Sequence, residues 1–169
     1  TTVSDNALEL KFQFHRYQEK ILKSNKRFLA AIAGVQSGKT YLGCMWLISE
    51  ILKGWNESKD YSYLICAPTY KILQQSTLRK WLEIVPPWLG EYKEQKSVFE
   101  LKDGKGVVYI RSSDDPEGLE GMTLKAAWLD EAGQVADRVW HVIQSRLAIL
   151  RGRLLITTTP YTYNWVYYD

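Results

Sequence analysis

The sequence predicts an α/β fold in which a mostly parallel sheet lies between helices. Apolar, strand-like runs alternate along the chain with segments whose apolar residues recur at helical spacing. A small glycine-containing loop joins the first such strand to its helix, and an acidic pair closes a later strand. Parallel strands need crossover connections, which are usually helices, so this alternation favours a parallel sheet. The 169 residues suffice for one domain with a sizeable core.

The first predicted strand, residues 28–33, is an apolar run that we expect to be buried, and it leads into the segment AGVQSGKT. An apolar helical pattern starts directly after this segment, which completes the strand, loop and helix of a P-loop. Small loop residues let backbone N–H groups approach a polyphosphate, and the positive end of the helix faces the anion. Ala33 stands where the first glycine is usual, and Gly34 follows it. A plain loop between core elements is the alternative, which the flanking strand and helix disfavour.

Each residue of this loop has an expected contact with ATP. Lys39 would reach the β- and γ-phosphates, and the Thr40 hydroxyl would coordinate Mg²⁺. The other loop residues would bind phosphate through their backbone: Gly34, Val35, Gln36, Ser37 and Gly38.

A short amphipathic helix is predicted upstream of the first strand, over residues 14–22. It contains Gln18, whose amide can pair with the N6 and N7 edge of adenine through one acceptor and one donor. In many nucleic-acid-stimulated ATPases this position holds an adenine-reading glutamine, and we interpret Gln18 in this way. A glutamine exposed on a surface helix is the alternative.

The middle of the chain continues the alternation. Residues 61–67 predict a second strand, and residues 97–101 with 107–111 predict an antiparallel hairpin. The acidic run within residues 112–118 is interpreted as solvated loop and helix cap rather than as a metal site. A helix is predicted between the second strand and the hairpin, and it ends at Pro86 and Pro87. The prediction depends on the helical spacing of apolar residues, which are Leu73, Leu78, Trp81, Leu82 and Val85.

An apolar strand over residues 124–131 ends in the second chemical landmark, Asp130 and Glu131. In P-loop ATPases the first carboxylate holds the Mg²⁺ shell, and the adjacent glutamate orients the attacking water. Neighbouring side chains of a strand point in different directions, as two separate tasks require. A strand followed by a polar turn is the alternative, but with the P-loop present we favour the site. The fold expected is thus that of an ASCE-type, RecA-like P-loop NTPase.

A last helix over residues 139–150 carries Arg146 beside its apolar face, and a strand over residues 154–159 ends the pattern. The hydroxyls of Thr157, Thr158 and Thr159 can sense the γ-phosphate from a strand next to the P-loop strand. Threonine is also a good strand former, and the residues alone leave both readings open.

Charge, cysteine content and the lengths of apolar runs bear on the binding partners and the cellular location of the protein. The net charge of +3 is compatible with nucleic-acid binding without arguing for it. Cys44 and Cys66 lie in apolar segments and are expected to be buried, reduced thiols. No apolar run is long enough for a membrane span and no secretory signal is present, so we expect a cytoplasmic protein without a membrane partner. We expect residues 1–169 to be a single domain cut from a longer protein.

The quoted motifs resemble the N-terminal packaging ATPase domain of the large terminase subunit of tailed bacteriophages. The resemblance runs from about Phe12 to the end and depends on FHRYQ, AGVQSGKT, GLEGMTLKAAWLDEAGQ and LLITTTPYTYNWVY. It implies a motor that hydrolyses ATP with Mg²⁺ to drive double-stranded viral DNA into a capsid, in the cytoplasm of the infected host. The implied partners are the portal protein, the small terminase subunit and further copies of the chain in a ring. A nuclease domain would follow Asp169.

Residue by residue, the resemblance implies Gln18 at adenine, Lys39 and Thr40 in the P-loop, Asp130 at Mg²⁺ and Glu131 as the catalytic glutamate. It implies that the three threonines of residues 157–159 form the coupling motif. Many relatives carry an arginine in the phosphate loop, where this chain has Val35 or Gln36. Some carry an arginine just before the glycine that matches Gly121, where this chain has Glu120. The arginine finger from a neighbouring subunit is therefore unassigned, with Arg146 as the first candidate and Arg138 or Arg111 as the next.

Two other functions share these motifs. A helicase-type nucleic-acid-stimulated ATPase would have the same glutamine, P-loop and acidic pair, but normally needs a second motor domain. A nucleotide-binding assembly module would bind ATP without turnover, which the intact Glu131 disfavours. A small-molecule kinase fits less well, because a glutamate placed to activate water suits hydrolysis.

Overall fold

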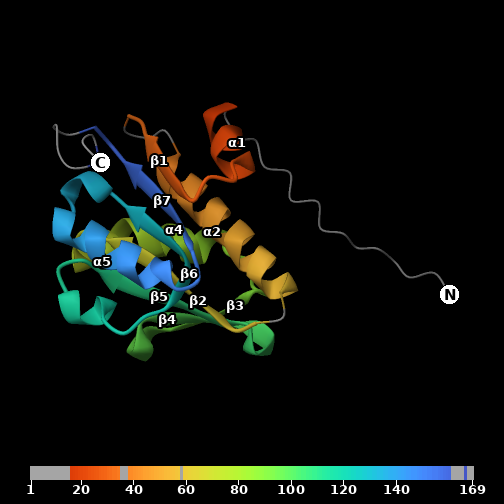
Figure 1. The fold of residues 1–169 in the computed structure, drawn as a ribbon. Coiled ribbons are helices and arrows are strands. Elements are labelled where there is room, and N and C mark those ends of the chain that lie inside the picture. Colours follow the sequence, from red (N-terminus) through yellow and green to blue (C-terminus); the bar gives the residue numbers. More distant parts are fainter. Residues whose placement is uncertain (1–15, 35–37, 58, 161–165, 167–169) are drawn as a thin grey trace.

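A single β-sheet forms the centre of the computed structural model, which describes residues 16–34, 38–57, 59–160 and 166. Among these residues seven strands pair in the order β1-β7-β6-β2-β5-β4-β3 (Figure 1). The first five strands of this order are parallel, and β4 and β3 are antiparallel to their neighbours, so the predicted α/β class is confirmed. The strands are β1 (Phe28–Ile32), β2 (Tyr61–Ala67), β3 (Gly90–Lys93), β4 (Val98–Leu101), β5 (Gly106–Ser112), β6 (Leu124–Asp130) and β7 (Arg153–Thr158).

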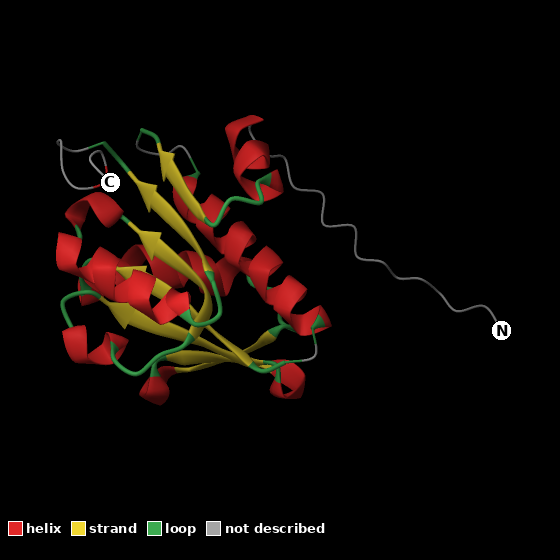
Figure 2. Cartoon of the chain, viewed as in Figure 1, coloured by secondary structure: helices red, strands yellow, loops and turns green. Residues whose placement is uncertain are grey.

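Helices cover both faces of this sheet (Figure 2). The long helix α2 packs with α1 and α4 against one face, and α5 packs against the other. A π-helical segment, Leu73–Thr77, joins α3 to α4 without a break in the helix. The helices are α1 (Arg16–Lys23), α2 (Lys39–Asn56), α3 (Tyr70–Ile72), α4 (Leu78–Ile84) and α5 (Asp137–Ala148).

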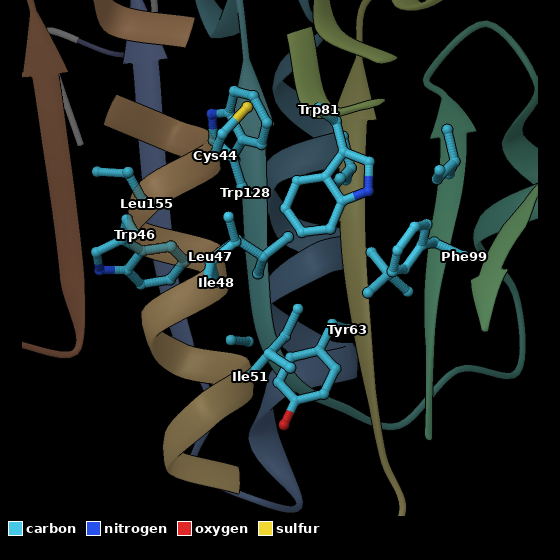
Figure 3. Close-up of a cluster of buried hydrophobic side chains, with 14 of the residues drawn as sticks. Cys44, Trp46, Leu47, Ile48, Ile51, Tyr63, Trp81, Phe99, Trp128 and Leu155 are labelled. Carbon is cyan, nitrogen blue, oxygen red and sulfur yellow. The ribbon is translucent and has the colours of Figure 1, made fainter. Parts of the chain in front are cut away.

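The central strands β2 and β6 are apolar over most of their length, and both of their faces are buried. Successive side chains of a strand point to opposite faces, so Tyr63 packs under α2 while Leu64 packs under α5. Figure 3 shows the first of these two layers, where side chains of α2 meet Tyr63, Trp81 and Trp128. Continuous apolar runs of this kind are typical of parallel strands covered on both sides.

Gly43 sets the distance between α2 and the sheet. A Cβ atom built on this glycine would lie 1.9 Å from the ring of Trp128, so only glycine permits this approach. The contact places Trp128 of β6 directly under the first turns of α2.

The predicted buried thiols, Cys44 and Cys66, are both free and buried. Burial raises the pKa of the Cys66 thiol to about 12.

The structure corrects the prediction that the first strand is buried. Among the described residues β1 pairs with β7 alone and forms an edge of the sheet. Only Ala31 of this strand is buried, whereas Phe28 and Ile32 are 41% and 39% exposed. An apolar run indicates a strand, but whether both of its edges are paired depends on the rest of the fold.

The helix predicted through Val85 differs from expectation in one side chain. Leu82, placed on its apolar face by spacing, is 42% exposed in the structure. Leu78 and Trp81 are the buried residues of α4, so Leu82 lies at the border of the buried face rather than within it. The predicted hairpin is present as β4 and β5, and the short strand β3 beside it was not predicted.

Candidate nucleotide-binding site

The predicted site residues gather at the carboxyl edge of the parallel sheet. In the strand register Thr157 of β7 lies between Ala31 of β1 and Asp130 of β6. The P-loop begins one step beyond β1, where Ala33 donates its N–H to the Thr158 carbonyl. Ligands of open α/β sheets bind outside this edge, so the topology alone brings the P-loop and the acidic pair together.

The described part of the phosphate loop is closed by Lys39, the first residue of α2. Its Nζ donates to the Gly34 carbonyl at 2.6 Å, and the side chain is only 6% exposed. The ammonium group therefore bridges the two ends of the loop. Three residues predicted to bind phosphate, Val35, Gln36 and Ser37, lie outside the described residues.

Gly38 turns the chain from the loop into α2. Its φ of +77° is left-handed, a conformation that glycine adopts without steric cost. Its carbonyl accepts from Leu42 N at 2.9 Å, the first hydrogen bond of the helix. The N-terminal N–H groups of α2 follow directly, as an anion site at a helix start requires.

Gln18 lies against this turn rather than on the surface. It is 2% exposed, and its Nε2 donates to the Gly38 carbonyl at 3.2 Å. The alternative of an exposed glutamine is thus wrong, because α1 is held against α2 with Gln18 inside the contact. Pairing of Gln18 with adenine stays a prediction.

Among the residues that the structure describes, Asp130 accepts four hydrogen bonds, all from neutral donors. Its Oδ2 accepts from Thr77 at 2.7 Å and from Thr40 at 3.4 Å. Its Oδ1 accepts from the Thr157 hydroxyl at 2.8 Å and from the Glu131 N–H at 3.1 Å. Burial raises the pKa of Asp130 above its ordinary value, although the hydrogen bonds from Thr77 and Thr157 oppose this rise.

Glu131 leaves β6 through a left-handed backbone, with φ of 50°. This conformation is uncommon for a residue with a side chain, and such outliers gather at functional sites. The strand ends at Asp130, one residue earlier than predicted. The turn, and not the alternation of a strand, therefore sets the direction of Glu131.

The three threonines of the predicted coupling motif differ in their contacts. Thr157 accepts from Trp128 Nε1 at 2.8 Å and donates to Asp130. The Thr158 hydroxyl accepts from the Gly133 N–H at 2.9 Å, which ties β7 to the loop after Glu131. Thr159 lies beyond the end of β7.

Thr77 belongs to the same cluster, and sequence reasoning missed it. It sits at the end of the π-helical segment, is fully buried, and makes the shortest of the four contacts with Asp130. One signal was available. Leu73 and Leu78, which share the apolar face, are five residues apart, and that spacing fits a π turn better than an α-helix.

The arginine candidates are placed differently. Arg146 of α5 is half-buried, and its Nε donates to the Leu119 carbonyl at 3.0 Å. Arg111 donates to three carbonyls, those of Ser97, Ile110 and Gly118. Arg138 is exposed at the start of α5.

The donors at this edge suit a magnesium ion. Asp130 and Thr40 offer a carboxylate and a hydroxyl oxygen 3.4 Å apart, and Mg²⁺ prefers hard oxygen ligands. Among the described residues no three His, Cys, Asp or Glu side chains gather as a metal cluster. Magnesium bound together with a nucleotide uses one or two carboxylates plus phosphate oxygens, so the residues present fit it.

Comparisons with known proteins agree with this geometry. The family model described as terminase large subunit, T4likevirus-type, N-terminal, matches residues 31–169. The chain is 40% identical to the terminase large subunit of Thermus phage G20c over 58 residues. These aligned residues make up 34% of this chain and 12% of that protein. The chain thus aligns with a small part of this curated relative.

Solved structures share the fold. The large terminase ATPase domain of Thermus phage P74-26 superposes with a TM-score of 0.73 at 24% identity, over 93% of this chain and 69% of that one. The large terminase of bacteriophage HK97 gives 0.70 at 15% identity, over 88% of this chain and 33% of that one. A large terminase from a thermophilic bacteriophage, solved in complex with ADP, gives 0.71 at 14% identity, over 86% of this chain and 39% of that one.

The helices were also compared with the length and apolar character that a bilayer requires. In the part of the chain that the structure describes, no helix is both long and apolar enough to cross a membrane.

Proposed function

This chain belongs to the family of terminase large subunits, T4likevirus-type, N-terminal, and on that premise we propose that it is an ATPase motor domain for DNA packaging. It would hydrolyse ATP to translocate double-stranded viral DNA into a procapsid. The observation that carries the proposal is the contact between Thr40 of the phosphate loop and Asp130 of β6. This contact joins the two motifs at one edge of the sheet, where a nucleotide with its metal would bind.

The phosphates of ATP would bind at the start of α2. The Lys39 ammonium, which now contacts the Gly34 carbonyl, would exchange this contact for the β- and γ-phosphates. Thr40 and Asp130 would hold Mg²⁺, which when bound neutralises phosphate charge. Gln18, beside Gly38, would pair with the adenine edge.

Hydrolysis would depend on Glu131, which would accept a proton from the attacking water and orient it. An arginine from a neighbouring subunit would stabilise the charge that develops on the phosphates, and Arg146 remains our first candidate. Thr157, Thr158 and Thr159 would couple the reaction to movement, since Thr157 and Thr158 contact Asp130 and the loop after Glu131.

The proposed partners follow from the family. They are double-stranded viral DNA, a portal protein, a small terminase subunit and further copies of the chain in a ring. The proposed place of action is the cytoplasm of the infected bacterium. A nuclease domain belongs to the same proposal for the longer protein.

The proposal is tested by measuring phosphate release against protein concentration, with Mg²⁺, in the protein that carries this chain. Lys39→Ala and Glu131→Gln should each lower turnover by orders of magnitude, and Glu131→Gln should retain ATP binding. Glu83→Gln, which changes an exposed glutamate on α4, is the matched control and should keep parental turnover. Turnover that rises more than linearly with concentration would support completion of the site between subunits.

Three outcomes would contradict the proposal. Unchanged turnover in Glu131→Gln would remove the assigned catalytic glutamate, and tight ATP binding without phosphate release, even with DNA and portal present, would indicate a binding module. Displacement of a third strand from a DNA triplex measures movement along a duplex. Separation of the duplex strands instead would favour a helicase.

A further inference from the structure

We propose that Thr77, presented by the π-helical segment Leu73–Thr77, is a positioning residue that holds the Asp130 carboxylate in the orientation needed for the metal of the nucleotide complex. This inference rests on the proposed function, because it assigns a second residue to the same site. Thr77 comes from the helix that follows β2 and belongs to neither of the two sequence motifs of the site.

The contact geometry separates Thr77 from the other donor on the same oxygen. Thr77 Oγ1 lies 2.7 Å from Asp130 Oδ2, whereas Thr40 Oγ1 lies 3.4 Å from it. Thr40 is expected to coordinate the metal ion, and its hydrogen bond to Asp130 Oδ2 is longer and weaker than that of Thr77. Thr77 is fully buried and is left to hold Oδ2 in place.

The opposite oxygen is held in a matching way. Thr157 donates to Asp130 Oδ1, because an ionised carboxylate can only accept, and the Thr157 oxygen in turn accepts from Trp128 Nε1. Thr77 and Thr157 thus hold one carboxylate oxygen each. Both donors are neutral, so they fix the orientation of the carboxylate without cancelling the charge that a cation would use.

The π turn explains how a threonine reaches this position. Leu78 N–H donates to the Leu73 carbonyl, five residues back, so the segment holds one residue more than an α-helical turn. One extra residue rotates the following helix by about 100°. Leu73 and Leu78 therefore both face the core, and Thr77 is buried between them.

Packing alone does not account for a threonine here. A valine would fill nearly the same space, and a buried hydroxyl is costly unless it is hydrogen-bonded. The Thr77 hydroxyl has its partner in Asp130. The buried contact therefore indicates a role for the hydroxyl, and π turns are frequent at functional sites.

The test is the affinity for ADP, measured by calorimetry with Mg²⁺ and again with EDTA, in the protein that carries this chain. The ratio of the two dissociation constants gives the gain in affinity due to the metal. Thr77→Val should lower this gain roughly tenfold, as loss of a group that orients a metal ligand does. Affinity in EDTA should stay parental, because Lys39 and the loop bind phosphate without Asp130.

Two controls separate the hydroxyl from its surroundings. Thr77→Ser keeps the hydroxyl and should keep the gain within about twofold of the parental value. Thr69→Val removes a hydroxyl at the start of the same helix, where Thr69 Oγ1 accepts from Ile72 N at 3.2 Å, and should leave the gain unchanged. If Thr77→Val does not fold, Thr77→Ala takes its place with the same expected loss.

Three results would overturn the inference while leaving the proposed function standing. They are a parental gain in Thr77→Val, a loss in Thr77→Ser as large as that in Thr77→Val, and an equal loss in Thr69→Val. A parental protein that gains nothing from Mg²⁺ would overturn the proposed function, and this inference with it. A parental gain that Thr77→Val retains would overturn the inference alone.

Discussion

Glu50 and Asp130 are both buried carboxylates, 6% and 1% exposed, but the chain surrounds them with different groups. Glu50 of α2 accepts from the Arg153 guanidinium and, at 3.0 Å, from Lys53. Asp130 accepts from three hydroxyls and one peptide N–H. At Glu50, which links α2 to β7, the cations of Arg153 and Lys53 balance the negative charge. Where the donors are neutral, the negative charge stays available for the metal ion of the proposed function.

The two arrangements differ in their effect on stability. A buried charge is costly unless it is paired, and among the described residues the hydrogen-bond donors to Asp130 are all neutral. Active sites commonly carry a cost of this kind, because the arrangement that suits the ligand is not the most stable one without it. Substitutions at Asp130 and at Glu50 should therefore have separable effects on activity and on stability.

The largest expected effect is on turnover. Asp130→Asn should lower ATP hydrolysis about a hundredfold or more, because the amide removes the charge that would hold the metal. Glu50→Gln, the matched change at the other site, should leave turnover per folded molecule within about twofold. Phosphate release, corrected for the folded fraction by circular dichroism, measures both. Equal losses would show that the comparison does not separate function from structure.

The next effect is on the free energy of unfolding. Arg153→Met should lower it by about 3 kcal/mol, because removing one partner leaves the buried Glu50 charge poorly compensated. The same change removes bonds from Arg153 to the Ser24 and Lys26 carbonyls. Lys53→Met is the control and should cost less than about 1 kcal/mol, since Lys53 is 56% exposed. Urea unfolding measures both, and a loss below about 1 kcal/mol in Arg153→Met would contradict the prediction.

The smallest effect depends on pH. The pKa of Asp130 is raised in the folded state, so the folded protein binds more protons, and its stability falls as pH rises from the ordinary aspartate pKa to the raised one. Asp130→Asn does not titrate there. Its stability relative to the parental protein should therefore increase as the pH rises from about 4 to about 7. Urea unfolding at both pH values, without metal, measures this change, and a constant difference would contradict it.

The sequence could predict the residues that local pattern brings together. Lys39 and Thr40 follow a strand and a small loop directly, and Asp130 ends an apolar run, so their position at one sheet edge follows from the parallel topology. Gln18 was predicted to bind adenine; the structure places it against Gly38 of the P-loop, and its pairing with adenine stays a prediction.

The remaining features depend on contacts between distant segments. Thr77 meets Asp130 only because a π turn rotates its helix, and the pairing of Glu50 with Arg153 joins residues 103 positions apart. The exposure of β1 likewise depends on which strands pair beside it. Neither hydrophobic period nor motif spacing contains this information.

The π turn also affects how sequences of this family should be aligned. Between Leu73 and Leu78 the chain has one residue more than an α-helix of the same course would use. A relative with a regular helix there would differ by a single-residue deletion inside a helix, where alignment methods place gaps reluctantly. An ungapped alignment would then shift every position of α4 by one and compare Thr77 with a neighbour of its true counterpart. Superposed backbones, rather than aligned letters, should decide which residue of a relative faces the carboxylate.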